Sequence, residues 1–186
     1  MQKRHTDRES YFGEQSQTSK NYYIPYIKEV IGHIPDKVLE VGCGEGGNLL
    51  PFAEAGCRVM GVDIDATRIE QARTFFAQRH QQGQFIATDI FQLKDKATNF
   101  PLILLHDVIE HIRDKERFLS GLQKHLSADG AIFVGFPAWQ MPFGGHQQIA
   151  HSHIVSHFPF LHLLPRTLYR WILRPVSYTH LTLPTK

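Results

Sequence analysis

Hydrophobic residues cluster in five short runs along the chain, and most of these runs are separated by stretches with helical spacing. The runs predict buried strands at 37–41, 58–62, 84–88, 102–106 and 131–136. Helices are predicted at 21–34, 48–55, 66–81 and 115–126. Alternating strands and helices are typical of an α/β fold, so we expect a Rossmann-like, doubly wound parallel sheet with helices on both faces.

The two ends of the chain lack this alternation. Residues 1–20 are polar, and we expect them to form a frayed N-terminal segment. The region after Phe136 is rich in proline, histidine and aromatic side chains. We therefore place the core domain at 21–138 and a lid or substrate segment at 139–174.

Charge and cysteine content narrow the class of protein. A formal net charge of +2 argues against a strong nucleic-acid field, so no nucleic-acid partner is expected. Cys43 and Cys57 are the only cysteines, which implies no disulfide framework and fits a reducing compartment. No apolar stretch has the length of a spanning helix, and the polar N-terminus is unlike a signal peptide. We expect a cytoplasmic protein.

Four glycines lie within six residues directly after the first predicted strand, in the stretch KVLEVGCGEGGN. Glycines after a strand let the backbone turn tightly and let a ligand approach the main chain. Gly42, Gly44 and Gly47 also fit the spacing G-x-G-x-x-G. By itself this spacing is compatible with a dinucleotide site, with another nucleotide site, or with a tight turn.

Acidic residues at the strand ends narrow these alternatives. Glu40 precedes Gly42 by two residues, where an anion would repel a pyrophosphate but would suit a ligand with a cationic amino group. Asp63 closes the second strand, where a carboxylate can accept both hydroxyls of a ribose, and Asp89 closes the third. The structural alternatives are a strand-end ion pair for Glu40, a helix cap for Asp63 and a turn residue for Asp89. Asp65 is better placed than Asp63 to cap the next helix.

Five stretches, in order, resemble motifs of the class I S-adenosylmethionine-dependent methyltransferases: VLEVGCGEGGN, VMGVDID, FIATDI, LILLHDVIEHI and LSADGAIFVGFPA. The resemblance covers residues 22–138. It implies that Glu40 and the loop with Gly42, Gly44 and Gly46 surround the methionine part of S-adenosylmethionine. The remaining cofactor contacts that it implies are Asp63 and Ile64 at the ribose, Asp89 and Ile90 at the adenine, and His106 near the cofactor.

The stretch HDVIEHI supplies candidate catalytic groups after the fourth strand. In a helical turn, Asp107, Glu110 and His111 would share one face, directed towards the transferred methyl group. Methyl transfer is an in-line displacement that mainly requires orientation of the two reactants. An oxygen acceptor must also lose its proton, and His111, with Glu110 beside it, is the natural general base. The structural alternative is that Glu110 and His111 begin the next helix.

A divalent metal site is a less favoured alternative. The pattern Asp-x-x-Glu-His resembles the Glu-x-x-Glu-His metal motif of small-RNA 2′-O-methyltransferases and of some ubiquinone-biosynthesis methyltransferases. His146 or His151 would then supply a further ligand, and His153 and His157 are four residues apart. However, Asp107 is shorter than the expected Glu, and no cysteine lies near these histidines. We therefore assign no metal ligand.

The C-terminal part of the chain departs from the family pattern. The lid segment mixes apolar residues with arginines, which suggests a lid packed on the domain or a weak contact with a membrane surface. The last twelve residues, 175–186, resemble an adapter-derived tail, and we exclude them from the fold. We accordingly expect the C-terminal antiparallel hairpin of the family to be missing.

The combined pattern predicts an S-adenosylmethionine-dependent methyltransferase that acts on a small molecule. Three alternatives stay open: a metal-assisted O-methyltransferase, an inactive cofactor-binding fragment, and an NAD-dependent oxidoreductase.

Overall fold

The structure is a computed structural model of the chain and describes residues 7–93, 97–137, 142 and 158–173. The chain divides into two compact units. The larger unit is Asp7–Phe136, and the described residues of the other are 137, 142 and 158–173.

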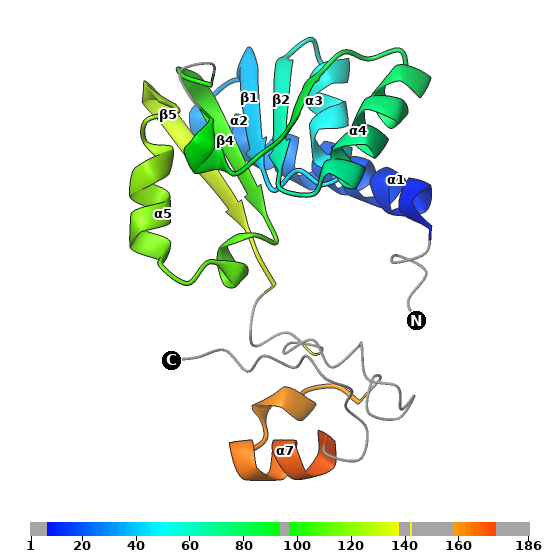
Figure 1. Cartoon of the computed structure of the whole chain (residues 1–186), viewed down its shortest axis with the longest axis vertical. Helices are drawn as coiled ribbons and strands as arrows, with labels where there is room; N and C mark the ends of the chain where they lie inside the picture. The colour runs from blue at the N-terminus through cyan, green and yellow to red at the C-terminus, as the bar shows by residue number, and fades with distance from the viewer. Residues whose placement is uncertain (1–6, 94–96, 138–141, 143–157, 174–186) are drawn as a thin grey trace. The chain divides into compact units, whose positions relative to one another are not determined.

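The larger unit is built on a five-stranded parallel sheet with the order β3-β2-β1-β4-β5 (Figure 1). The strands are β1 (Lys37–Val41), β2 (Arg58–Asp63), β3 (Gln84–Ala87), β4 (Phe100–His106) and β5 (Leu126–Gly135). The crossovers contain α3 (Leu50–Glu54), α4 (Ala66–Gln78) and α5 (Lys115–Leu122). This arrangement confirms the predicted α/β fold, and it brings the C-terminal ends of all five strands to one edge of the sheet.

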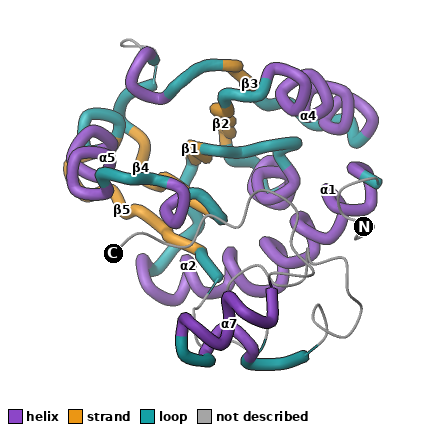
Figure 2. The backbone as a smooth tube through the Cα atoms, turned by 60° about the horizontal axis from the view of Figure 1, so that its bottom comes forward, coloured by secondary structure: helices purple, strands orange, loops and turns teal. Residues whose placement is uncertain are grey.

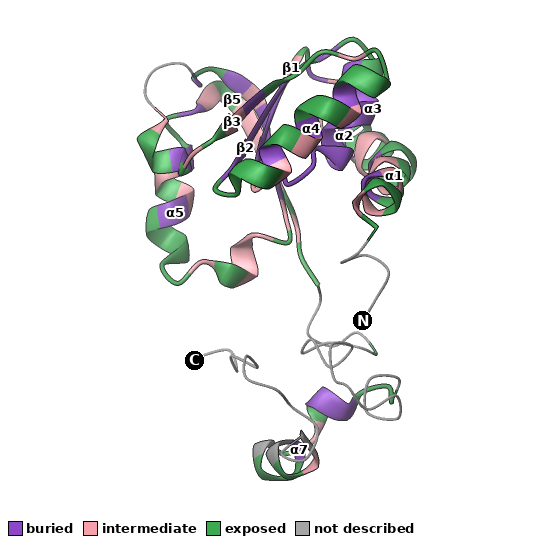
Figure 3. Cartoon of the chain, turned by 45° about the vertical axis from the view of Figure 1, so that its right-hand side comes forward, coloured by how far each residue is buried: buried purple, intermediate pink, exposed green. Residues whose placement is uncertain are grey.

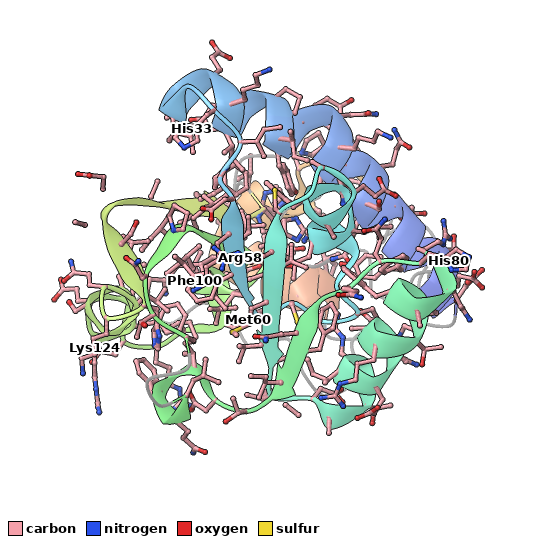
Figure 4. All side chains as sticks on the ribbon, turned by 90° about the horizontal axis from the view of Figure 1, so that it is seen from above. His33, Arg58, Met60, His80, Phe100 and Lys124 are labelled. Carbon is pink, nitrogen blue, oxygen red and sulfur yellow. The ribbon has the colours of Figure 1, made fainter. Side chains whose placement is uncertain are left out.

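Two hydrophobic cores, one on each face of the sheet, follow from the alternation of side chains along the strands. In β4, Leu102 and Leu104 pack with α3 and α4, whereas Ile103 and Leu105 pack with α5. The strands β1 and β2 are almost completely buried, as Figure 3 shows. His80, which follows α4, and Lys124, which follows α5, lie at opposite margins of the unit in Figure 4.

The expectation of a frayed N-terminus is wrong for residues 8–18, which form α1 (Arg8–Thr18). The Asp7 side chain caps this helix by accepting a hydrogen bond from the Ser10 amide at 2.9 Å. Phe12 is fully buried, with its ring 4.9 Å from that of Phe75. A contact with a distant aromatic ring therefore fixes a helix whose own sequence has little amphipathic pattern.

A π-helical turn, η2 (Ser19–Tyr23), connects α1 to α2 (Ile24–Ile31) without a break in the helix (Figure 2). The predicted helix at 21–34 therefore begins earlier and contains a π turn. The Ser19 hydroxyl donates a hydrogen bond to the carbonyl of Asn48 at 2.8 Å. This bond ties the turn to the segment that follows the glycine loop.

The fifth strand starts earlier than predicted. Leu126 pairs with Phe100 and Ala131 pairs with Leu102, so residues 127–130 bulge opposite the single residue Pro101. Proline has no amide hydrogen and cannot donate to the ladder, which explains why the irregularity lies there. The predicted turn at Asp129–Gly130 is part of this bulge.

The second unit contains a short 3-10 helix, η7 (Leu161–Leu163), and α7 (Arg166–Leu173). Leu161, His162 and Tyr169 are buried.

In the described part of the chain, no helix is long and apolar enough to cross a membrane. The predicted non-native tail, 175–186, and most of the lid segment lie outside the described residues.

Candidate functional site

The glycine loop leaves the end of β1 in a conformation that requires glycine at three positions, Gly42, Gly44 and Gly46. Gly42 and Gly44 have φ angles of 74° and 52°, in the left-handed region. The amides of Gly42 and Cys43 donate to the carbonyl of Val62, at 2.7 and 3.1 Å. The loop is therefore tied to the neighbouring strand β2 rather than free.

Side chains also approach the loop closely at Gly42 and Gly44. A Cβ atom at Gly42 would lie 2.4 Å from Cγ2 of Val108, and one at Gly44 would lie 2.2 Å from Nη2 of Arg68. A larger residue at either position would collide with these groups. The glycines thus permit close approach of the Val108 and Arg68 side chains, and the approach of a ligand to the same backbone stays a prediction.

Asp63, at the end of β2, organises the loop. Its Oδ2 accepts a hydrogen bond from the amide of Gly44 at 2.8 Å, and its Oδ1 accepts one from the amide of Asp65 at 2.9 Å. The carboxylate is 7 % exposed. Asp65, not Asp63, caps α4 by accepting from the amides of Thr67 and Arg68, which confirms that assignment.

Glu40 is buried at the other side of the loop, with only 1 % of its surface exposed. Its Oε1 accepts a hydrogen bond from Nδ2 of Asn48 at 2.8 Å. Its Oε2 and the Oδ1 atom of Asn48 are buried and have no hydrogen-bond partner among the described residues. Burial raises the pKa of Glu40 to about 8, and the hydrogen bond from Asn48 opposes this shift only in part. The site therefore has two buried acceptors that suit a ligand with several N–H donors.

An ion cluster behind the loop was not predicted from the sequence. Glu45 is fully buried and accepts two hydrogen bonds from Arg68, at 3.1 and 2.8 Å. Arg8 of α1 adds a third contact at 3.3 Å. The only sequence signal for this cluster is an acid inside a glycine loop, because both arginines are distant in the sequence.

The residues predicted at the ribose and adenine lie near the ends of β2 and β3. Ile64 is 82 % exposed, and Asp89 is exposed and caps η4 (Ile90–Gln92) by accepting from the amide of Phe91 at 3.0 Å. Ile90 is 4 % exposed, and its side chain packs in the core that contains α5.

The residues after β4 form a more open group. Asp107 has a φ angle of 54°, which is uncommon for a residue other than glycine. Its Oδ2 lies 3.7 Å from Nδ1 of His106. Glu110 and His111 lie in the short 3-10 helix η5 (Ile109–His111), with 4.0 Å between Oε1 and Nε2. The side chains of His111 and Asp107 are 67 % and 45 % exposed, whereas those of Glu110 and His106 are 23 % and 21 % exposed.

Tyr23 joins this edge of the sheet from the π turn, and sequence reasoning did not assign it to the site. Its ring lies 5.6 Å from that of His106 and 4.9 Å from that of Phe133. Burial, and then the nearby charges of Asp107 and Glu40, raise the pKa of its phenol to about 12.

No three His, Cys, Asp or Glu side chains within the described ranges are grouped so that they could hold a metal ion. The histidines of the alternative metal site, His146, His151, His153 and His157, lie outside the described residues.

Comparisons with known proteins agree with this fold. The chain is 33% identical over 118 residues to the ubiquinone biosynthesis O-methyltransferase of Bartonella quintana (strain Toulouse), covering 61% of this chain and 48% of that protein. It is 34% identical over 98 residues to the enzyme of the same name from Brucella ovis, covering 53% of this chain and 40% of that protein. The chain thus spans about half the length of the curated relatives that it matches.

Among solved structures, PKMT2 from Rickettsia typhi in complex with AdoHcy is similar, with 28% identity and a TM-score of 0.56 over 70% of this chain and 27% of that chain. Coclaurine N-methyltransferase bound to N-methylheliamine and SAH shares the fold, with 24% identity and a TM-score of 0.53 over 60% of this chain and 34% of that chain. The family model described as "Methyltransferase domain" matches residues 39–132, which is just over half of the chain. The chain therefore belongs to the methyltransferase domain family.

Proposed function

We propose that this chain binds S-adenosylmethionine and transfers its methyl group to a small-molecule acceptor. The observation that supports this most directly is Glu40, a buried acid beside the glycine loop. Its Oε2 atom finds no hydrogen-bond donor within the part of the chain that the structure describes. The methionine ammonium group of the cofactor carries a positive charge and N–H donors, so it would satisfy both Glu40 and the neighbouring Oδ1 of Asn48.

The residues present fit the rest of the cofactor. Each carboxylate oxygen of Asp63 accepts one hydrogen bond from the backbone and retains a lone pair for a ribose hydroxyl. Ile64 would lie beside the ribose, and Asp89 with the backbone of Ile90 would bind the adenine. Gly42, Gly44 and Gly46 would line the methionine part, and His106 would lie near the reacting end.

The group after β4 fits the acceptor side of the reaction. The bound cofactor supplies a methyl group on a sulfonium, which already has a good leaving group, so the chain mainly orients the acceptor. For a hydroxyl acceptor, His111 takes the proton as general base, and Glu110, 4.0 Å away, stabilises the imidazolium that forms. The names of the relatives, which describe O-methyltransferases, support a hydroxyl acceptor.

We also propose a weak contact of the second unit with a membrane surface. Five large apolar side chains in its short described segment are 43–71 % exposed: Phe158, Phe160, Leu163, Leu168 and Trp171. An aromatic and leucine-rich surface of this kind suits the interfacial region of a bilayer.

The free, buried Cys43 and Cys57 support a reducing, cytoplasmic location.

Calorimetry with three ligands tests the proposal. We expect binding of S-adenosylmethionine and S-adenosylhomocysteine and much weaker binding of NAD. Loss of charged ribose hydrogen bonds in Asp63→Ala should reduce the affinity at least about tenfold. Tighter binding of NAD would favour an oxidoreductase, and cofactor binding without turnover of any small-molecule hydroxyl would indicate an inactive binding fragment.

A further inference from the structure

The π-helical turn Ser19–Tyr23 lies directly beside the proposed cofactor site. The Ser19 hydroxyl is hydrogen-bonded to the carbonyl of Asn48, and the Asn48 side chain is hydrogen-bonded to Glu40. A π turn accommodates an additional residue in a helix and is frequently found at functional sites. The turn therefore links the N-terminal helix to the acid that is expected to bind the cofactor.

The three tyrosines of this helical segment differ in their environment. Tyr22 and Tyr26 are 68 % and 57 % exposed, whereas Tyr23 is half-buried, with its ring packed against those of His106 and Phe133. Tyr23 is the last residue of the π turn, and its ring contacts place it beside His106, the last residue of β4. Packing against these two rings restricts the orientations that the Tyr23 side chain can adopt.

The phenol of Tyr23 lies where two acidic groups influence it. The carboxylates of Asp107 and Glu40 both act on it electrostatically, and burial together with these charges keeps it protonated. A protonated phenol can donate one hydrogen bond to a carboxylate and can accept from an N–H donor at the same time. An ammonium group held by Glu40 would be such a donor.

We infer that Tyr23 contacts the cofactor. Its hydroxyl binds the methionine part of S-adenosylmethionine between Glu40 of β1 and Asp107, which follows β4. This inference rests on the proposed function. Tyr23 lies outside the residues matched by the family model, which begin at position 39. A contact with the methionine part predicts dependence on the amino-acid half of the ligand and not on its nucleoside half.

Two ligands and one matched control test the contact. S-adenosylhomocysteine carries the amino-acid part, whereas 5′-methylthioadenosine lacks it. In calorimetry, Tyr23→Phe should weaken S-adenosylhomocysteine about tenfold, the effect of one hydrogen bond to a charged group, and should change 5′-methylthioadenosine by less than about twofold. Tyr22→Phe, the same chemical change at the exposed neighbouring tyrosine, should alter neither affinity.

The outcomes separate the contact from the proposed function. If the wild-type chain binds neither ligand, the proposed function and this inference both fail. If the wild type binds and Tyr23→Phe leaves both affinities unchanged, or weakens both equally, Tyr23 is not a cofactor contact, or only supports the fold. If the variant is less stable, the ratio of the two affinities still decides, because partial unfolding lowers both alike.

Discussion

The ends of β1 and β4 are neighbours on the same edge of the sheet, but their surroundings differ. At the end of β1, Glu40 is buried and hydrogen-bonded, and the loop that follows is fixed by Asp63. After β4, the side chains of Asp107 and His111 are largely exposed. The strand end that is proposed to bind the cofactor is thus more buried and more fixed by hydrogen bonds than the strand end that is proposed to face the acceptor.

This comparison predicts that the largest loss of stability arises behind the glycine loop. Arg68→Ala leaves the fully buried Glu45 with Arg8 alone, and breaking a buried pair in this way costs about 3–5 kcal/mol. Chemical denaturation measures the loss. The control is Arg58→Ala, which removes an exposed pair with Asp36 whose two side chains are 75 % and 73 % exposed. That change should cost at most about 1 kcal/mol, and equal losses for both variants would contradict the difference between the two regions.

The second prediction is a gain in stability, not a loss. The pKa of Glu40 is about 8 in the folded protein and ordinary in the unfolded chain, so ionisation opposes folding increasingly as the pH rises from about 4.5 to 8. Glu40→Gln removes this cost and should stabilise the protein at pH 8.5 by up to about 4–5 kcal/mol, because each tenfold change in proton affinity is worth about 1.4 kcal/mol. Below about pH 4 the gain should vanish. A pH series of denaturation curves for the variant and the wild type measures it.

The same variant should bind S-adenosylmethionine more weakly, because a neutral amide cannot replace the carboxylate opposite an ammonium group. Greater stability with lower affinity would show that Glu40 is kept for binding and not for folding. A variant that loses stability at pH 8.5 would show that the buried acid is ionised and well compensated.

The pH dependence of binding provides a third test. If Glu40 must ionise to hold the ammonium group, cofactor affinity in the wild type should rise by up to about tenfold per pH unit below pH 8 and then level off. Calorimetry at several pH values should also show proton release on binding. In Glu40→Gln this rise should be absent, and its persistence there would assign the titration to another group.

The smallest effect is expected after β4. His111→Gln changes a side chain that is 67 % exposed, so the free energy of unfolding should change by less than about 0.5 kcal/mol. Cofactor affinity should also be unchanged, because His111 is assigned to the acceptor. A clear loss of either property would show that the group after β4 is part of the same built structure as the glycine loop.

The sequence predicts an element correctly where the residues of that element themselves carry the pattern that identifies it. The buried run Lys37–Val41, the glycines and the cap Asp65 predicted β1, the loop and the start of α4. In contrast, α1 depends on the contact of Phe12 with Phe75, which lies far along the chain. The ion cluster at Glu45 likewise depends on two distant arginines, and no local pattern indicates them.

The position of Tyr23 likewise cannot be predicted from the local sequence. The helical period predicts that tyrosines four residues apart share a face, and Tyr22 and Tyr26 do lie exposed together. The π turn that places Tyr23 against His106 depends on packing of the helices on both sides of it. Local propensity does not distinguish such a turn from a regular helix.

The π turn also sets how this region responds to a change in chain length. An α-helix turns by about 100° per residue, so deleting one residue from Ser19–Tyr23 would rotate α1 and α2 by that angle relative to each other. Either Phe12 or Ile27 would then leave the core, since both are buried in the present register. Substitutions at the exposed Tyr22 should be tolerated, whereas single-residue deletions next to it should not. In a deletion scan, the turn would stand out as a site where the number of residues matters more than their identity.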